Sequence, residues 1–69
     1  MPNGPKAYRV KPLMTAFRMS GWTLKVLAGE TNLSDSTLSR IFRQNGPVSA
    51  KAVNKVADAL HVSRWEIWR

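Results

Sequence analysis

Signals that begin and end helices divide this chain into five short segments, and they constrain its fold more than any other feature of the sequence. A capping residue or a proline stands at the start of each segment, and Gly, Asn or a Pro-containing turn follows most of them. The last segment has the spacing of a capping box at Ser63 and Glu66. The expected helices cover residues 11–20, 23–31 and 34–44, a fourth begins at the Ser49 cap and carries apolar residues as far as Leu60, and a short fifth begins at Ser63 and closes the chain. Because no stretch carries a strand pattern, the sequence predicts an all-α fold.

The apolar residues of these segments recur at the spacing of helix faces that pack on a core. Four apolar side chains of the fourth segment share one face: Val53, Val56, Ala57 and Leu60. Val48 precedes the Ser49 cap, at the position from which a hydrophobic staple contacts Val53. Met14 and Met19 are expected to fill gaps in the same core. The segments are therefore expected to form one bundle.

A chain of 69 residues has room for one small domain, which is expected over residues 10–69. Residues 1–9 contain Pro2, Gly4 and Pro5, and they are expected to form a flexible arm. Charged residues interrupt the apolar positions that follow, so neither a signal peptide nor a membrane span is expected. The sequence has no cysteine, which excludes disulfides and is compatible with a reducing cytoplasm.

The charge of the chain indicates a polyanionic partner, because 11 basic side chains face only 4 acidic ones and the formal net charge is +7. The stretch from Ser36 to Ala57 contains four basic residues and no acid. Nucleic acid and an anionic membrane both fit this pattern. His61 has no second His, no Cys and no pair of acids at ligand spacing, so no catalytic site, metal site or cofactor is expected.

Residues 34–45, SDSTLSRIFRQN, combine an apolar side with an unusual polar one. On a helix, Leu38, Ile41 and Phe42 gather on one side. The opposite arc holds Asp35, Ser36, Ser39, Arg40, Arg43 and Gln44. This arc offers two arginines, small hydroxyls and an amide, which can reach into a groove of a partner and form hydrogen bonds with the groups at its edges. An ordinary surface helix carries a mixture of Glu and Lys there instead.

The spacing of apolar residues from Leu24 onward carries a family resemblance. Within a twenty-residue window, apolar residues occupy the positions that a helix-turn-helix requires: Leu27, Ala28, Leu33, Leu38 and Ile41. Over about residues 10–68 the chain resembles the Cro and repressor-type DNA-binding domains of the xenobiotic-response-element family. A narrower likeness joins it to the headpiece of lac-repressor-type regulators. Two residues depart from the pattern, since Asn32 replaces the usual turn glycine and Thr31 replaces an aliphatic residue.

The resemblance implies a five-helix Cro/repressor-like bundle whose central helix-turn-helix binds DNA, with helix 34–44 in the major groove. The resemblance implies that four residues at the family's base-reading positions contact base edges: Asp35, Ser36, Ser39 and Arg40. It also implies a set of residues that contact DNA phosphates: Thr23, Lys25, Ser34, Thr37, Arg43, Gln44, Asn45, Ser49 and Lys51. In each set some residues could have a purely structural role instead. The Asp35 carboxylate is also favoured by the dipole at a helix N-terminus, and Ser34 and Ser49 also cap helices.

The last segment indicates a homodimer. Trp65 and Trp68 flank Ile67, and a bundle this small is not expected to bury both indoles. Family members commonly pair through their C-terminal helix region, so the resemblance implies a two-fold pair with Trp65 and Trp68 at its interface. The alternative is that one tryptophan packs over the first helix and the other is exposed.

Three functions remain open. The resemblance favours a transcriptional regulator of the Cro or repressor type, which occupies a double-stranded DNA operator in the cytoplasm of a bacterial or phage-infected cell. An antitoxin or phage accessory factor would use the same fold but bind mainly another protein. A membrane-active basic protein is suggested by Trp22, Trp65 and Trp68. Short capped helices with a shared core argue against it, so neither a membrane nor a small-molecule partner is expected.

Overall fold

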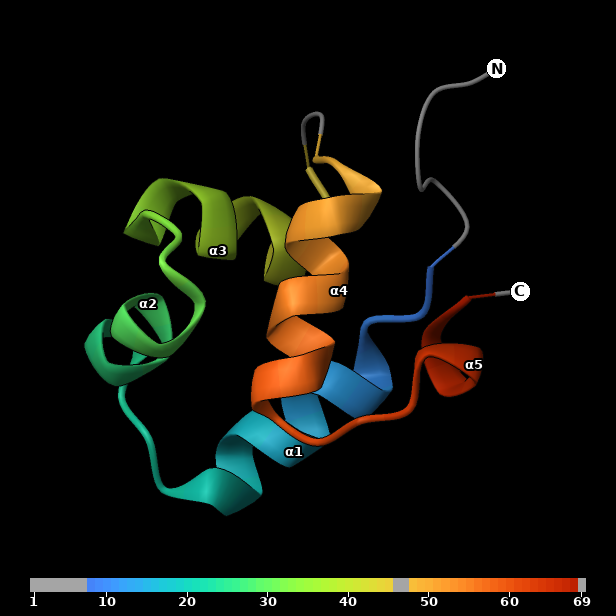
Figure 1. Cartoon of the computed structure of the whole chain (residues 1–69), viewed down its shortest axis with the longest axis horizontal. Helices are drawn as coiled ribbons and strands as arrows, with labels where there is room; N and C mark the ends of the chain where they lie inside the picture. Colours follow the sequence, from blue (N-terminus) through green and yellow to red (C-terminus); the bar gives the residue numbers. More distant parts are fainter. Residues whose placement is uncertain (1–7, 46–47, 69) are drawn as a thin grey trace.

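The computed structural model describes residues 8–45 and 48–68, and within them it contains five α-helices and no strand (Figure 1). The helices are α1 Lys11–Ser20, α2 Leu24–Thr31, α3 Asp35–Arg43, α4 Ala50–Ala59 and α5 Arg64–Ile67. The all-α fold class is therefore confirmed. The helix limits agree with the expected ones to within about a residue at most ends, because local capping chemistry sets them.

Hydroxyl caps begin the three central helices. Thr23, Ser34 and Ser49 each have an extended backbone, and their side-chain oxygens accept N–H hydrogen bonds at 3.2, 3.2 and 3.1 Å from the first turns of α2, α3 and α4. In α5 the Glu66 carboxylate accepts the N–H of Ser63 at 3.3 Å, as the capping-box spacing predicts. These bonds satisfy N–H groups that have no partner inside the helix.

Left-handed residues end the first three helices. Gly21, Asn32 and Gln44 have φ angles of 75°, 60° and 55°. Gly and Asn are usual in this conformation, and both are sequence signals for a helix end. Gln44 is an unusual residue here, and its conformation could not be expected from its type.

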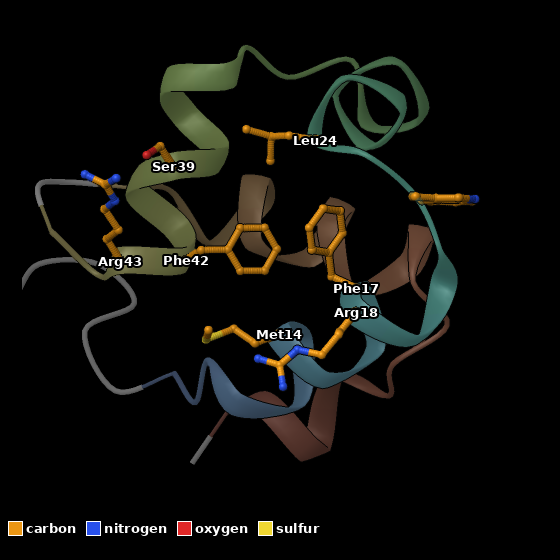
Figure 2. Close-up of a pocket in the computed structure, with 8 residues that line it drawn as sticks. Met14, Phe17, Arg18, Leu24, Ser39, Phe42 and Arg43 are labelled. Atoms are coloured by element: carbon orange, nitrogen blue, oxygen red, sulfur yellow. The ribbon is translucent and has the colours of Figure 1, made fainter.

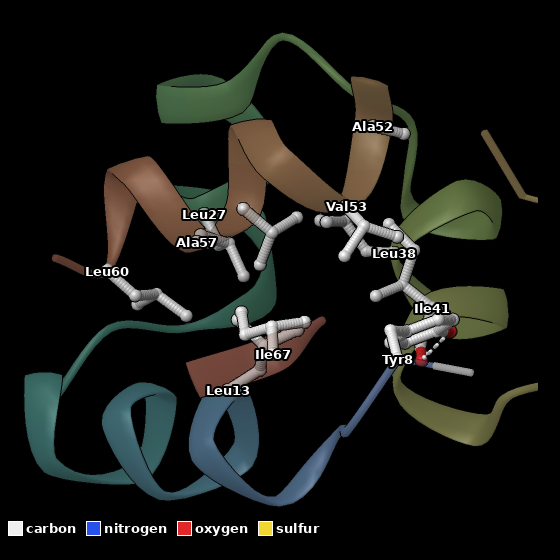
Figure 3. Close-up of a cluster of buried hydrophobic side chains, with 11 residues drawn as sticks. Tyr8, Leu13, Leu27, Leu38, Ile41, Ala52, Val53, Ala57, Leu60 and Ile67 are labelled. Atoms are coloured by element: carbon white, nitrogen blue, oxygen red, sulfur yellow. Dashed lines mark hydrogen bonds between the residues drawn. The ribbon is translucent and has the colours of Figure 1, made fainter. Parts of the chain in front are cut away.

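The core lies between α4 and the helices around it. α4 packs against α2 and α5, α2 also packs against α3, and α1 contacts α5 (Figure 1). The expected apolar face of α4 is buried, and it meets apolar residues from every other helix (Figure 3). The core consists of Tyr8, Leu13, Leu27, Leu38, Ile41, Ala52, Val53, Val56, Ala57, Leu60 and Ile67.

Thr31 and the two methionines of α1 differ in how they relate to the core. Thr31, which replaces an aliphatic residue, is buried, and its hydroxyl donates to the Leu27 carbonyl at 2.8 Å, so the polar atom is satisfied. Met14 and Met19, however, are 40% and 82% exposed, so the expectation that they fill the core is wrong. Met14 lies beside Phe17 and Phe42 at the surface, and Met19 near the end of α1 is the more exposed of the two.

The expected arm over residues 1–9 is wrong at its last two residues. Tyr8 is 6% exposed, and its hydroxyl donates to the Ile41 carbonyl at 2.7 Å (Figure 3). The Arg9 N–H donates to the Ile67 carbonyl at 2.8 Å. The ordered domain thus includes Tyr8, two residues before the expected start of the domain at residue 10. Residues 1–7 lie outside the described part of the chain.

Candidate nucleic-acid interface

Helix α3 buries one side and presents the other to solvent. Leu38 and Ile41 are completely buried. The four residues expected to contact base edges all lie on the remaining surface of α3: Asp35, Ser36 and Arg40 are exposed, and Ser39 is half-buried. Arg43 is exposed one turn beyond Ser39. The helix therefore carries a polar face of mixed donors and acceptors, with its two arginines towards the C-terminal end.

The basic side chains near this face have no acidic partner. Within residues 8–45 and 48–68 the one ion pair joins Arg64 to Asp58 at 2.9 Å, at the start of α5. Arg40 and Arg43 are thus free of carboxylates, and Lys25 and Lys51 are exposed on α2 and α4. Unpaired cations on one domain create the positive field that attracts a polyanion.

The hydroxyls expected to contact phosphate have first of all a capping role. Thr23, Ser34 and Ser49 each accept a backbone N–H, which leaves the hydroxyl hydrogen free to donate to another group. The Ser34 and Thr37 oxygens lie 3.0 Å apart, so one of those two hydroxyl hydrogens is used between them. Capping and phosphate binding are therefore compatible at all three helix starts.

Gln44 and Asn45, also expected to contact phosphate, follow α3. The Asn45 side chain is exposed. Gln44 instead turns part of its amide inward, and its Nε2 donates to the Tyr8 carbonyl at 2.9 Å. This contact spans 36 residues of sequence, and no local pattern indicates it. Gln44 ties the segment before α1 to the end of α3.

The two C-terminal tryptophans occupy different environments. Trp65 is 80% exposed, in agreement with the expected surplus of apolar surface on α5. Trp68 is half-buried, its Nε1 donates to Asn54 Oδ1 at 2.8 Å, and its ring lies edge-on to Tyr8 with centroids 5.8 Å apart. Sequence reasoning assigned no role to Tyr8 or Asn54. The one signal for Tyr8 was its residue type, because a tyrosine ring favours burial when its hydroxyl finds a hydrogen-bond partner.

Neither a cluster of metal ligands nor a helix long enough to span a membrane occurs in the part of the chain that the structure describes. No group of three or more His, Asp or Glu side chains in that part of the chain lies close enough to hold a metal ion. None of its helices is long and apolar enough to cross a membrane.

Three features define a helix-turn-helix domain: a first helix that packs on the core through Leu13, a capped pair of helices joined by a tight turn at Asn32, and the exposed polar face of the second helix of that pair, α3. The model of the helix-turn-helix family matches residues 13–66, which is most of the chain. The protein belongs to this family, in its Cro/repressor type, and it is a DNA-binding regulatory domain. No curated protein and no solved structure gives a significant match.

Proposed function

We infer that this protein is a sequence-specific regulator of transcription that inserts α3 into the major groove of an inverted-repeat operator. The observation that carries the proposal is the exposed polar face of α3, whose arginines have no carboxylate partner. In a helix-turn-helix the second helix of the pair reads bases while the first crosses the phosphate backbone. Here α2 and α3 take these two positions. A bound operator would be closed to polymerase, so the expected effect is repression.

Base reading is assigned to the first two turns of α3. Arg40 can donate two hydrogen bonds to the O6 and N7 atoms of a guanine, which is the commonest specific contact in the major groove. The Asp35 carboxylate can accept from the amino group of a cytosine, and Ser36 and Ser39 can bond to several bases. The contacts of Arg40 are expected to contribute most of the discrimination.

Phosphate contacts are assigned to the edges of this face. Lys25, Arg43 and Lys51 are exposed cations on three different helices, so they can bind phosphates on both sides of the groove. The capped starts of α2, α3 and α4 add backbone N–H groups and hydroxyl donors. These groups set affinity and register but carry no sequence information.

Two copies are expected to act together. An inverted repeat has two-fold symmetry, so a homodimer places two copies of α3 on half-sites about one DNA turn, or about 34 Å, apart. Trp65 is the assigned centre of the dimer contact because it is the most exposed large ring in the described part of the chain. Trp68 is assigned to the edge of that contact.

Selection from random duplex DNA at several salt concentrations tests the proposal. We expect an enriched site with inverted symmetry and a binding constant that falls steeply with salt, since each phosphate contact releases condensed counterions. An absence of binding even at low salt would overturn the proposal. Binding without any enriched sequence would reassign the protein to general DNA coating.

A further inference from the structure

An open groove separates α1 from α3 and is closed at one end by the start of α2. Its volume is about 510 Å³. Phe17 of α1 and Phe42 of α3 face each other there, with ring centroids 5.4 Å apart, and Leu24 and Met14 lie on opposite sides of the pair (Figure 2). Trp22 also lines the groove. The surface of this groove is therefore mainly apolar, and three of its eight lining residues are aromatic.

The polar side chains that line the groove can all donate hydrogen bonds, and two of them are charged. Arg18 of α1 and Arg43 of α3 contribute one guanidinium each, and Ser39 contributes a hydroxyl (Figure 2). None of the four Asp and Glu side chains lines the groove, and within the part of the chain that the structure describes both arginines are exposed and form no ion pair. The groove thus combines an apolar interior with a positive charge that the protein itself does not neutralise.

We propose that this groove is a binding site for a small organic anion with a flat apolar body, of the aromatic carboxylate class. The volume is within the range of about 300–1,000 Å³ that is usual for small-molecule sites. A guanidinium matches a carboxylate in geometry and can bind it through two hydrogen bonds, while the rings pack on the apolar body. A DNA phosphate satisfies the charge of such a site but leaves its apolar surface empty. This site departs from the sequence-based expectation that the protein has no small-molecule partner.

Occupation of the groove should weaken DNA binding, a step that rests on the proposed function. Ser39 and Arg43 line the groove and are also assigned to DNA contacts on α3. A bound anion would neutralise Arg43 and place a negative charge beside the DNA phosphates, so both effects oppose DNA binding. The groove would then make this regulator responsive to a metabolite.

Direct titration without DNA tests the site. The probe is 2-naphthoate, and its neutral match is 2-naphthalenemethanol, which has the same ring system and no charge. Each is titrated into the ¹⁵N-labelled full chain, and binding is followed by NMR. We expect shift changes centred on Phe17, Leu24 and Phe42, with 2-naphthoate binding about tenfold more tightly than its neutral match. Equal binding of both compounds, or shift changes centred elsewhere, would overturn the proposal.

Two matched charge removals locate the anion. Arg18→Gln should weaken 2-naphthoate binding about tenfold and leave the weaker binding of the neutral compound unchanged. Arg9→Gln removes an exposed arginine that does not line the groove, so it should leave both affinities unchanged. Circular dichroism confirms that each variant is folded. Equal effects of the two substitutions would show that only net charge attracts the probe, and the groove would lose its assignment.

The effect on DNA is measured separately. For the wild type we expect saturating 2-naphthoate to raise the Kd for DNA several-fold, and the neutral compound to have a smaller effect. If 2-naphthoate binds in the groove and the Kd for DNA is unchanged, the regulatory step is wrong and the binding site stands. If the protein binds no DNA at all, the proposed function fails, while the direct titration still decides the site.

Discussion

Tyr8 shows how one side chain can hold together parts of the chain that lie far apart in sequence. The last carbonyls of a helix have no partner within it, and the Tyr8 hydroxyl donates to such a carbonyl at Ile41, close to the end of α3. The Tyr8 carbonyl in turn accepts from Gln44, and its ring contacts Trp68. The segment before α1 thereby fixes the end of α3 relative to α5.

The titration of Tyr8 should be shifted to alkaline pH. Burial raises the pKa of the Tyr8 phenol above its usual value of about 10, because the charged form is poorly solvated inside the protein. The neutral phenol contributes its full stability at pH values below the tyrosine pKa of the unfolded chain. This contribution is lost as the pH rises from that pKa through the higher pKa of the folded protein. Since this is the only tyrosine of the chain, ultraviolet absorbance follows it directly. We expect a midpoint above 10 in buffer and near 10 in denaturant.

Tyr8→Phe is the control for that titration. It removes the phenol and keeps the ring, so the absorbance change should vanish and the protein should remain folded near neutral pH. An identical midpoint in buffer and in denaturant would show that the phenol is accessible to water, in conflict with its buried position.

Arg40 and Lys25 should affect DNA binding in different ways. Arg40→Ala is expected to cost about 1–3 kcal/mol at the best site and to flatten the preference at one base position, because a bidentate base contact is lost. Lys25→Ala should weaken binding to all sequences alike. It should also reduce the slope of log K against log salt concentration by about 1, the change expected for the loss of one phosphate contact. Selection from random duplexes compares the two variants with the wild type. If Arg40→Ala selected an unchanged motif, the residue would be reassigned to phosphate or solvent.

At the scale of the elements, the helices could be predicted from the sequence because their limits depend on local chemistry. Thr23, Ser34 and Ser49 all form the capping bonds that their positions indicate. The left-handed conformation of Asn32 agrees with its place after a helix, since Asn is a usual helix-ending residue that tolerates this conformation. Gln44 was not expected to end α3 in this conformation, because its type gives no such signal and its amide bonds to a distant residue.

Asn32 should show how much the turn of the helix-turn-helix depends on its residue. At φ 60° a side chain with a β-carbon is strained, and Asn is less strained than Ala. Asn32→Ala is therefore expected to lower the free energy of unfolding by about 1 kcal/mol, while Asn32→Gly should change it little or raise it slightly. Urea unfolding of both variants provides the measurement. A stability order with Ala above Gly would mean that the turn adopts another conformation in solution.

At the scale of the whole molecule, the contacts that sequence reasoning missed are those between distant segments. The Tyr8–Ile41 and Trp68–Asn54 bonds join residues 33 and 14 positions apart, and neither follows a helical repeat or a capping pattern. The groove between Phe17 and Phe42 could not be predicted for the same reason, since its two rings come from α1 and α3 and meet only in the folded chain. The polar face of α3 could be predicted because a single helix carries all of it.

The structure also changes how the proposed dimer should be tested. Trp68 makes contacts within its own subunit, so Trp68→Ala should destabilise the fold by roughly 3 kcal/mol, the low end for truncation of a packed ring. Trp65 makes no such internal contact, and its 80% exposure leaves it available to a second copy. Trp65→Ala should therefore leave the free energy of unfolding nearly unchanged and weaken dimerisation.

Sedimentation equilibrium of Trp65→Ala and of the wild type, with and without the selected operator, separates these two effects. We expect the variant to be folded and monomeric at concentrations where the wild type pairs, and to bind the two half-sites of the operator independently. Loss of one ring from the centre of an interface commonly costs 2 kcal/mol or more, which is roughly thirtyfold in the dimer constant. An unchanged dimer constant together with cooperative operator binding would place the contact on another surface. Because Trp65 lies on α5, which contributes no residue to the lining of the groove, 2-naphthoate should bind this variant and the wild type equally.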